Sequence, residues 1–286
     1  MSRTAFWERE RRSWPNHEAS RFVRAAGIRW HVQQAGSGPA VLLVHGTGAS
    51  AHSWRDLLPI LAARHTVIAV DLPGHAFTEA VPASRYSLSG MGGALAELLA
   101  EIGQTPALCV GHSAGAALLC RMALDGLLAP ERIVSVNGAF LPLGGAASVL
   151  FAPIAKLFAG SPWMSRMIAH RAGEPASVAR LIAGTGSTLD ARGVDLYARL
   201  VREPSHVAGA LGMMANWNLL SLERDLKGLR TPLTLIAAEH DLAVPPQQAE
   251  RLRARLERAT LVRVPRLGHL AHEEAPGRFA ELVLAA

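Results

Sequence analysis

Cysteine is scarce in this chain of 286 residues. The two cysteines, Cys109 and Cys120, both lie in apolar runs. Two such thiols cannot form the dense disulfide framework of a small secreted domain, and they are typical of free cysteines in a reducing compartment. The N-terminal residues also carry charges where a secretory signal peptide needs an apolar core. We therefore expect a cytoplasmic protein.

Lysine is nearly absent, although the chain is basic. Lysine and arginine number 29 against 23 acidic residues, which gives a formal net charge of +6, and only Lys156 and Lys227 are lysines. The densest basic segments, residues 9–12 and 251–258, contain glutamates and show neither interleaved aromatic residues nor zinc-ligand spacing. This pattern favours a solvated surface and argues against nucleic-acid binding.

Apolar runs suited to a membrane span are also lacking. One uncharged stretch, residues 133–155, exceeds the roughly 20 residues that a spanning helix needs. Helix-breaking residues interrupt this stretch, namely Asn137, Pro142, Gly144, Gly145 and Pro153. It therefore predicts a buried strand followed by a loop and no transmembrane segment, while a weak association with a membrane surface stays open.

Hydrophobic residues make up 50% of the chain, which excludes a disordered protein. After a hairpin with strands 22–25 and 28–34, short apolar strands alternate with longer helical patterns. This alternation predicts an α/β fold with a mostly parallel sheet covered by helices on both faces. The later predicted strands are 40–44, 66–70, 107–110, 132–136, 233–237 and 260–264, and the predicted helices are 54–62, 87–102, 114–123, 247–256 and 276–284.

The alternation stops after Asn137 and resumes only after Gly228. The intervening residues are rich in alanine, glycine, methionine and tryptophan, and they show helical patches without a clear strand. We expect a helical lid over the carboxyl edge of the sheet. The predicted division is a first part of the core at 1–138, a cap at 139–228 and a second part of the core at 229–286.

A serine lies between two glycines in the segment Gly111-His112-Ser113-Ala114-Gly115. The segment follows a predicted strand and precedes a predicted helix, which is the context of a nucleophile elbow. Glycines permit the tight turn, and the strained backbone presents the serine hydroxyl at the start of the helix. The pattern predicts Ser113 as a nucleophile.

Such a serine needs a general base, and the base needs an acid that orients it. Asp241 and His269 each follow a predicted parallel strand, at the sheet edge where open α/β sheets bind ligands. The chain order serine, aspartate, histidine also fits this kind of triad. Glu239 and Asp125 are the competing acids, with Glu239 the stronger alternative, and Asn137, after strand 132–136, could orient a partner without bearing a charge.

Acyl transfer also needs two N–H donors for the developing oxyanion. We expect the backbone amides of Thr47, in the glycine-rich loop after strand 40–44, and of Ala114. Methionines and aromatic residues in the lid would pack around a large apolar ligand, although packing of the lid on the core explains the same residues. The expected substrate pocket comprises His45, Gly46, His112, Met213, Met214, Trp217 and Leu270, of which His45 and His112 are expected to act through hydrogen bonds.

A metal site is not predicted. His269 and His272 lie near Glu273 and Glu274, but their spacing in an expected loop gives no complete ligand set. No cofactor is predicted either.

Together these motifs resemble those of the α/β-hydrolase family over nearly the whole chain. The similar segments are Val44 to Gly46, Asp71 to His75, Gly111 to Gly115, Asp241 to Pro245 and Gly268-His269. The resemblance implies an α/β-hydrolase fold, and serine at the elbow disfavours haloalkane dehalogenases and epoxide hydrolases, which use aspartate there. The family commonly has glycine where Ala76 stands, which leaves the backbone geometry of that loop open.

Further segments resemble the magnesium-chelatase accessory proteins of bacteriochlorophyll biosynthesis. They are residues 14–16, 29–33, 45–48, 52–55, 122–126, 137–142, 213–217 and 268–274. This resemblance implies a role near magnesium insertion into protoporphyrin. Two functions stay open: a serine hydrolase acting on an ester-type bond of a hydrophobic substrate, and a non-catalytic protein that binds a tetrapyrrole or a chelatase subunit. The intact set of serine, acid and histidine favours the hydrolase.

Overall fold

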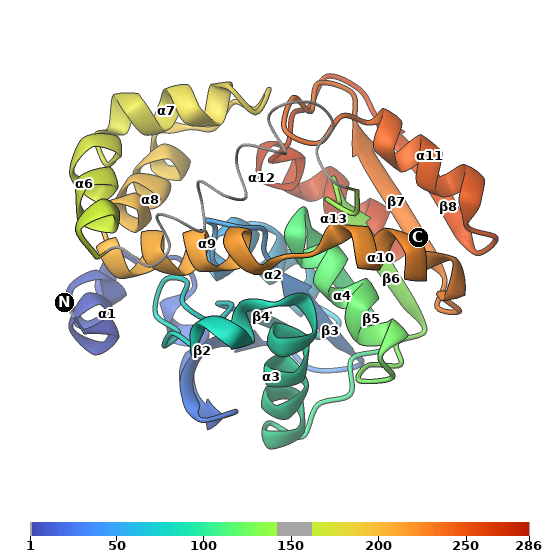
Figure 1. The fold of residues 1–286 in the computed structure, drawn as a ribbon, viewed down its shortest axis with the longest axis horizontal. Coiled ribbons are helices and arrows are strands. Elements are labelled where there is room, and N and C mark those ends of the chain that lie inside the picture. Colours follow the sequence, from blue (N-terminus) through green and yellow to red (C-terminus); the bar gives the residue numbers. More distant parts are fainter. Residues whose placement is uncertain (1, 142–161, 286) are drawn as a thin grey trace.

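Within the described residues, a sheet of eight strands forms the centre of the protein (Figure 1). The computed structural model describes residues 2–141 and 162–285. The strand order is β1-β2-β4-β3-β5-β6-β7-β8, in which β2 pairs antiparallel with β1 and β4, and all other neighbours are parallel. The strands are β1 (Ser20–Ala25), β2 (Ile28–Ala35), β3 (Ala40–Val44), β4 (Thr66–Val70), β5 (Leu108–His112), β6 (Arg132–Val136), β7 (Leu233–Ala238) and β8 (Ala259–Val264).

Helices cover both faces of this sheet, as predicted. The helices in the first part of the chain are α1 (Arg3–Glu10), α2 (Leu57–Ala62), α3 (Leu88–Glu101) and α4 (Ala114–Leu124). The helices after residue 161 are α6 (Pro162–Ala172), α7 (Pro175–Ala183), α8 (Ala191–Val201), α9 (Pro204–Asn216), α10 (Leu219–Asp225), α11 (Gln247–Arg255), α12 (Ala271–Glu274) and α13 (Pro276–Ala285).

Alternating side chains of the central strands pack into two separate cores. In β3, Leu42 and Val44 join the cluster formed with α3, α4, α10 and α11. The intervening Val41 and Leu43 join the cluster formed with α2 and α13. A strand that buries both faces must be apolar throughout, and this explains the short continuous apolar runs in the sequence.

The predicted strands are all present, with ends that shift by at most two residues. The predicted helix 54–62 is instead a short 3-10 turn, Ala51–Trp54, followed by α2. Helix α1 was not predicted, because four of its eight residues are charged and its sequence shows no apolar period. Its Phe6 and Trp7 rings pack on Phe77, with ring centroids 4.9 Å apart in both pairs, so tertiary contact rather than local pattern places this helix.

Helices α6 to α8 lie at the upper left of Figure 1, and α9 runs below them across the middle of the view. Helix α6 packs against α9, and α7 packs against α8. Helix α10 instead packs against α4, and its Leu222 is buried in the core beside the sheet. Residues 142–161 of the expected lid lie outside the described part of the chain, as does the end of the uncharged stretch 133–155. No helix in the described ranges is long and apolar enough to cross a membrane.

Candidate active site

Ser113 lies in the turn between β5 and α4, with a φ of 50° and a ψ of −116°. A positive φ is uncommon for a residue with a Cβ atom and costs on the order of 1 kcal/mol or more. The turn is fixed by two backbone hydrogen bonds, from Ser113 N–H to Val136 O (2.9 Å) and from Ala139 N–H to Ser113 O (3.1 Å). Ser113 is half-buried, whereas its neighbours His112 and Ala114 are buried.

Glycines around Ser113 are required by close backbone contacts. A Cβ atom on Gly115 would lie 2.2 Å from Val44 O, and one on Gly111 would lie 2.4 Å from Ala116 N. A Cβ atom on Gly46 would lie 3.0 Å from the Cβ atom of Ser113. The glycine-rich segment 45–48, which we call the oxyanion loop, therefore lies directly against the serine.

His269 and Asp241 are brought together by the loops after β8 and β7. His269 Nδ1 lies 2.7 Å from Asp241 Oδ2, and the Asp241 side chain is 1% exposed. The other carboxylate oxygen, Oδ1, accepts from the N–H groups of Ala243 and Val244, each at 2.8 Å. Three donors thus hold the buried carboxylate, while the competing Glu239 is exposed.

The backbone of His269 is held by two residues next to the elbow. His112 Nε2 donates to His269 O (3.0 Å), and the amide of Asn137 donates to the same oxygen (2.8 Å) and to Gly268 O (3.0 Å). Asn137 Oδ1 also accepts from Ala238 N–H at the end of β7 (2.8 Å). Asn137 therefore orients the histidine loop without bearing a charge. The rings of His112 and His269 lie 4.6 Å apart, so the His269 ring contacts the residue that precedes Ser113 in the elbow.

The N–H groups of Thr47 and Ala114, the expected oxyanion donors, lie in the loop after β3 and at the start of α4. Neither N–H group has a hydrogen-bond partner within residues 2–141 and 162–285. The oxyanion loop is shaped by His45, which is fully buried: its Nδ1 donates to Gly46 O (2.7 Å), and its Nε2 accepts from Leu72 N–H (2.9 Å). Burial lowers the pKa of His45, so the ring is neutral and can make both bonds.

Helix α9 contacts the oxyanion loop through His206 and Met213. His206 Nε2 donates to Gly48 O (3.1 Å), and its Nδ1 accepts from Ala76 N–H (3.0 Å). The Oγ1 atom of Thr47 lies 3.5 Å from the sulfur of Met213. Ala76 has a φ of 35°, so this loop keeps the left-handed backbone that glycine would adopt freely. Sequence reasoning missed His206, because no local motif marks it.

The remaining expected pocket residues differ in their exposure. Met213 is fully buried, whereas Met214 is 43% exposed, because consecutive helical residues point about 100° apart. Trp217, just after α9, is half-buried against the core beside the sheet. Leu270 is buried and packs with residues of α7 and α8.

A second unpredicted contact joins the acid and histidine loops. The carbonyl oxygen of Thr185, between α7 and α8, accepts from Leu242 N–H (3.1 Å) and His269 N–H (3.3 Å). Ser187 Oγ accepts from Leu270 N–H (2.8 Å). Two glycines in residues 184–186 predict a turn here, but they do not indicate which loops the turn contacts.

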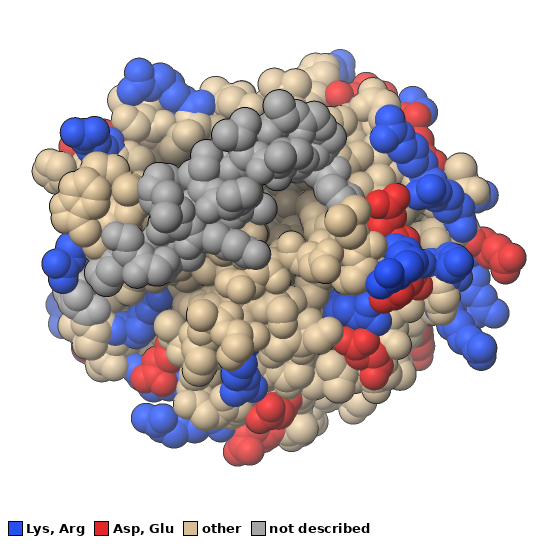
Figure 2. Space-filling model, in the orientation of Figure 1, with Lys and Arg blue, Asp and Glu red and all other residues tan. Residues whose placement is uncertain are grey.

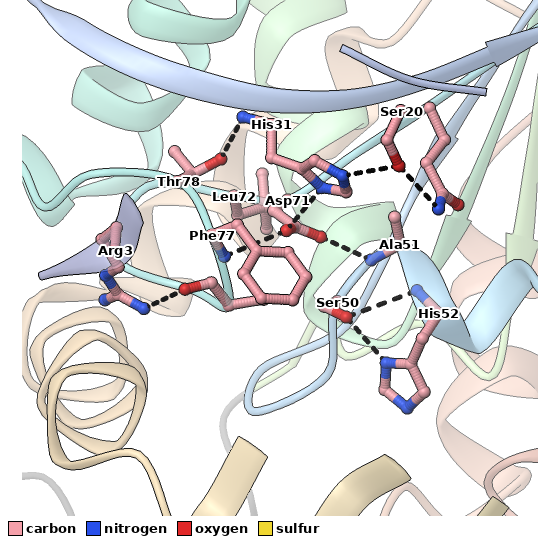
Figure 3. Close-up of polar contacts among 12 residues, drawn as sticks. Arg3, Ser20, His31, Ser50, Ala51, His52, Asp71, Leu72, Phe77 and Thr78 are labelled. Atoms are coloured by element: carbon pink, nitrogen blue, oxygen red, sulfur yellow. Dashed lines mark hydrogen bonds and ion pairs between the residues drawn. The ribbon is translucent and has the colours of Figure 1, made fainter. Parts of the chain in front are cut away.

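The buried carboxylate of Asp71 joins the segments that follow β3 and β4 to β2 (Figure 3). It accepts from the N–H groups of Ala51 (2.8 Å) and Phe77 (3.2 Å) and lies 2.8 Å from His31 Nδ1, whose Nε2 is 2.9 Å from Ser20 Oγ. Burial raises the pKa of Asp71, but attraction to His31 and the bonds that Asp71 accepts outweigh burial and lower it. The set joins β1 and β2 to the segment following the oxyanion loop.

The fold and these motifs define the class of protein. Residues 41–282 match the family described as "Alpha/beta hydrolase family". The chain belongs to the α/β-hydrolase family, which confirms the resemblance drawn from the motifs.

Individual relatives are similar over nearly the whole chain. The "Magnesium-chelatase 30 kDa subunit" of Rhodobacter capsulatus is 36% identical over 274 residues, covering 95% of each chain, which confirms the closer resemblance. An α/β-hydrolase-fold protein from Burkholderia ambifaria has a TM-score of 0.78 and 26% identity, covering 94% of this chain and 98% of that one. A meta-cleavage product hydrolase from Pseudomonas fluorescens IP01 has a TM-score of 0.74 and 25% identity, with the same coverage.

Proposed function

We propose that this protein is a serine hydrolase that cleaves an ester-type acyl bond of a large hydrophobic substrate. The observation that carries the proposal is the backbone of Ser113, which holds a non-glycine residue at a positive φ in the strand-to-helix turn. Such strain persists where the surrounding structure enforces it, and it clusters at functional sites. The hydrogen-bonded pair of His269 and Asp241 nearby supports the same reading.

In the proposed reaction, Ser113 Oγ attacks the acyl carbon while His269 Nε2 takes the hydroxyl proton. Asp241 fixes the imidazole with its proton on Nδ1 and stabilises the cation that forms. The N–H groups of Thr47 and Ala114 donate to the tetrahedral oxyanion. The leaving group then receives the proton from His269. Water next attacks the acyl-serine while His269 takes a proton from it, and His269 returns that proton to Ser113 Oγ as the acid product leaves.

Replacement of the nucleophile tests this proposal. Ser113→Ala should lower the kcat for p-nitrophenyl esters by roughly 10⁴-fold or more, because the acyl-enzyme cannot form. A fluorophosphonate should label the parent protein and not the variant. Ser135→Ala, which removes a buried serine on the neighbouring β6, is the matched control and should keep the parent rate. Equal turnover by Ser113→Ala and the parent would refute the assignment.

A second function is favoured by one specific finding, the 36% identity to a magnesium-chelatase subunit. In this alternative the protein binds a tetrapyrrole or a chelatase subunit without catalysis. A strain that lacks the gene distinguishes the two functions when it expresses Ser113→Ala at the parental level. Full restoration of bacteriochlorophyll synthesis by Ser113→Ala would support the binding function. Failure of this variant to restore it would support a catalytic role in that biosynthesis.

A further inference from the structure

A cavity of about 750 Å³ lies outside the candidate active site. Its walls come from three segments, the start of α1, residues 79–86 after β4, and one face of α9. None of Ser113, His269 and Thr47 lines it. The volume falls within the range of small-molecule sites.

Helix α9 separates this cavity from the oxyanion loop. Ala208, Gly212 and Ala215 line the cavity at spacings of four and three, which places them on one face of the helix. His206 and Met213, which contact the oxyanion loop, lie on another face of the same helix. Small residues on the cavity face leave the space open, and the nearby Val81 adds an apolar wall.

Arg3 brings a positive charge to this cavity, whose walls also carry the polar side chains of Glu79 and Asn216, although Arg3 itself is only 9% exposed. Its guanidinium donates to the carbonyl oxygens of Gly74, Ala76 and Ser205, the last at 2.8 Å. These bonds use three of the five N–H donors of an arginine. Burial lowers the pKa of Arg3 to about 10, so the group is still charged at neutral pH.

No carboxylate forms an ion pair with Arg3 in the described ranges 2–141 and 162–285. The acids nearby are bound elsewhere: Glu203 accepts from Ser205 Oγ, and Glu79, which also lines the cavity, accepts from Arg29 N–H. A buried cation normally has an anionic partner, because its desolvation is costly. The hydrogen bonds of Arg3 within the described ranges go only to backbone oxygens, while the charges of Glu203 and Asp71 act on it without forming an ion pair.

We propose that this cavity is a binding site for an apolar molecule that bears a carboxylate, with the carboxylate at Arg3 and the apolar part between α9 and residues 79–86. The site is separate from the proposed active site, and the inference does not depend on hydrolase activity. A ligand there would rest on the helix whose other face holds the oxyanion loop.

Equilibrium binding of two fluorescent probes tests the proposal. We expect 1-pyrenebutyrate to bind the parent protein about tenfold or more tightly than 1-pyrenebutanol, measured by fluorescence anisotropy, because only the acid can pair with Arg3. Arg3→Met should remove this preference while leaving the affinity for the alcohol within about twofold. Equal affinities of the two probes for the parent, or an unchanged preference in Arg3→Met, would overturn the proposal.

A second set of variants keeps the test decisive if Arg3→Met fails to fold. Ala208→Trp fills the cavity and should weaken both probes about tenfold or more, whereas Ala100→Trp, on the exposed face of α3, should weaken neither. Ser113→Ala should bind both probes as the parent does. Loss of binding in Ser113→Ala, or full binding in Ala208→Trp, would place the probes elsewhere and refute the site.

Discussion

At the scale of single residues, the two oxygens of the Asp241 carboxylate make two distinct sets of hydrogen bonds. One oxygen bonds His269, and the other accepts the N–H groups of Ala243 and Val244. Those two N–H groups can only donate, so they fix which side-chain atom faces them. The loop after β7 thereby determines which side-chain atom of a residue substituted at position 241 faces His269.

Asp241→Asn should lower kcat by roughly 10³- to 10⁴-fold while leaving the fold intact. The asparagine oxygen would stay on the two backbone N–H groups, so its amide nitrogen would face His269 Nδ1 and donate to it. The imidazole proton would then move to Nε2, where it blocks proton transfer from Ser113. Steady-state kinetics with p-nitrophenyl esters measure the loss.

Glu239→Gln is the matched control, because Glu239 is two residues away and exposed. It should keep the parent kcat within about twofold, as expected for an exposed side chain away from the reacting atoms. A large loss in Glu239→Gln together with a small loss in Asp241→Asn would reverse the assignment of the acid.

At the scale of elements, the turn between α7 and α8 connects these two helices with the two loops that carry Asp241 and His269. Gly186 in this turn has a φ of 82°, and a Cβ atom there would lie 1.8 Å from His240 O. Gly268 approaches the same turn, since its Cβ atom would lie 2.2 Å from Gly186. The turn therefore fits between the loops only with glycine at both points.

Gly186→Ala should lower kcat by roughly 10- to 100-fold, because the added methyl group forces the Asp241 loop away from His269. Gly93→Ala is the control, since a Cβ atom on this helical glycine of α3 meets no atom within 4 Å. That variant should keep full activity and gain slight stability from better helix propensity. The same kcat in Gly186→Ala and the parent would show that the turn does not position the acid.

At the scale of the whole molecule, arginines on the surface are interspersed with acids. Figure 2 shows blue and red side chains intermixed along the edge that carries α11 and β8 in Figure 1. Two ion pairs there are Arg255 with Glu223 (2.8 Å) and Arg263 with Glu250 (2.6 Å). Exposed pairs of this kind contribute little to stability, about 0 to 1 kcal/mol each.

Buried histidines dominate the expected pH dependence of stability. Burial lowers the pKa of six of them, and for His206 burial together with the charge of Arg3 lowers it to about 3. The unfolded chain binds a proton on such a residue below pH 6.5, while the folded protein does not. The residues concerned are His45, His52, His75, His112, His206 and His272.

The free energy of unfolding should therefore fall as the pH drops below about 6.5, and each histidine that stays neutral contributes about 1.4 kcal/mol per pH unit. Urea unfolding followed by circular dichroism at pH 7.5, 6.5 and 5.5 measures this slope. His206→Gln should make the slope shallower, whereas His170→Gln, at an exposed position, should leave it unchanged. A free energy of unfolding that stays constant from pH 7.5 to 5.5 would contradict the prediction.

The sequence by itself determined the order of strands and helices and the position of the elbow. These features depend on local chemistry: apolar runs that must be buried, and glycines where the chain turns sharply beside Ser113. Asp241 and His269 could also be predicted, because residues after parallel strands share one edge of the sheet.

Only the tertiary structure decided what holds these residues in place. His206 on Gly48, Thr185 on the histidine loop and Arg3 beside its cavity are contacts between segments far apart in the chain. No period or turn motif marks such residues, because each is selected by a partner that only folding brings near. Helix α1 shows the same limit, since aromatic packing on Phe77 stabilises it where its own charged sequence gives no helical pattern.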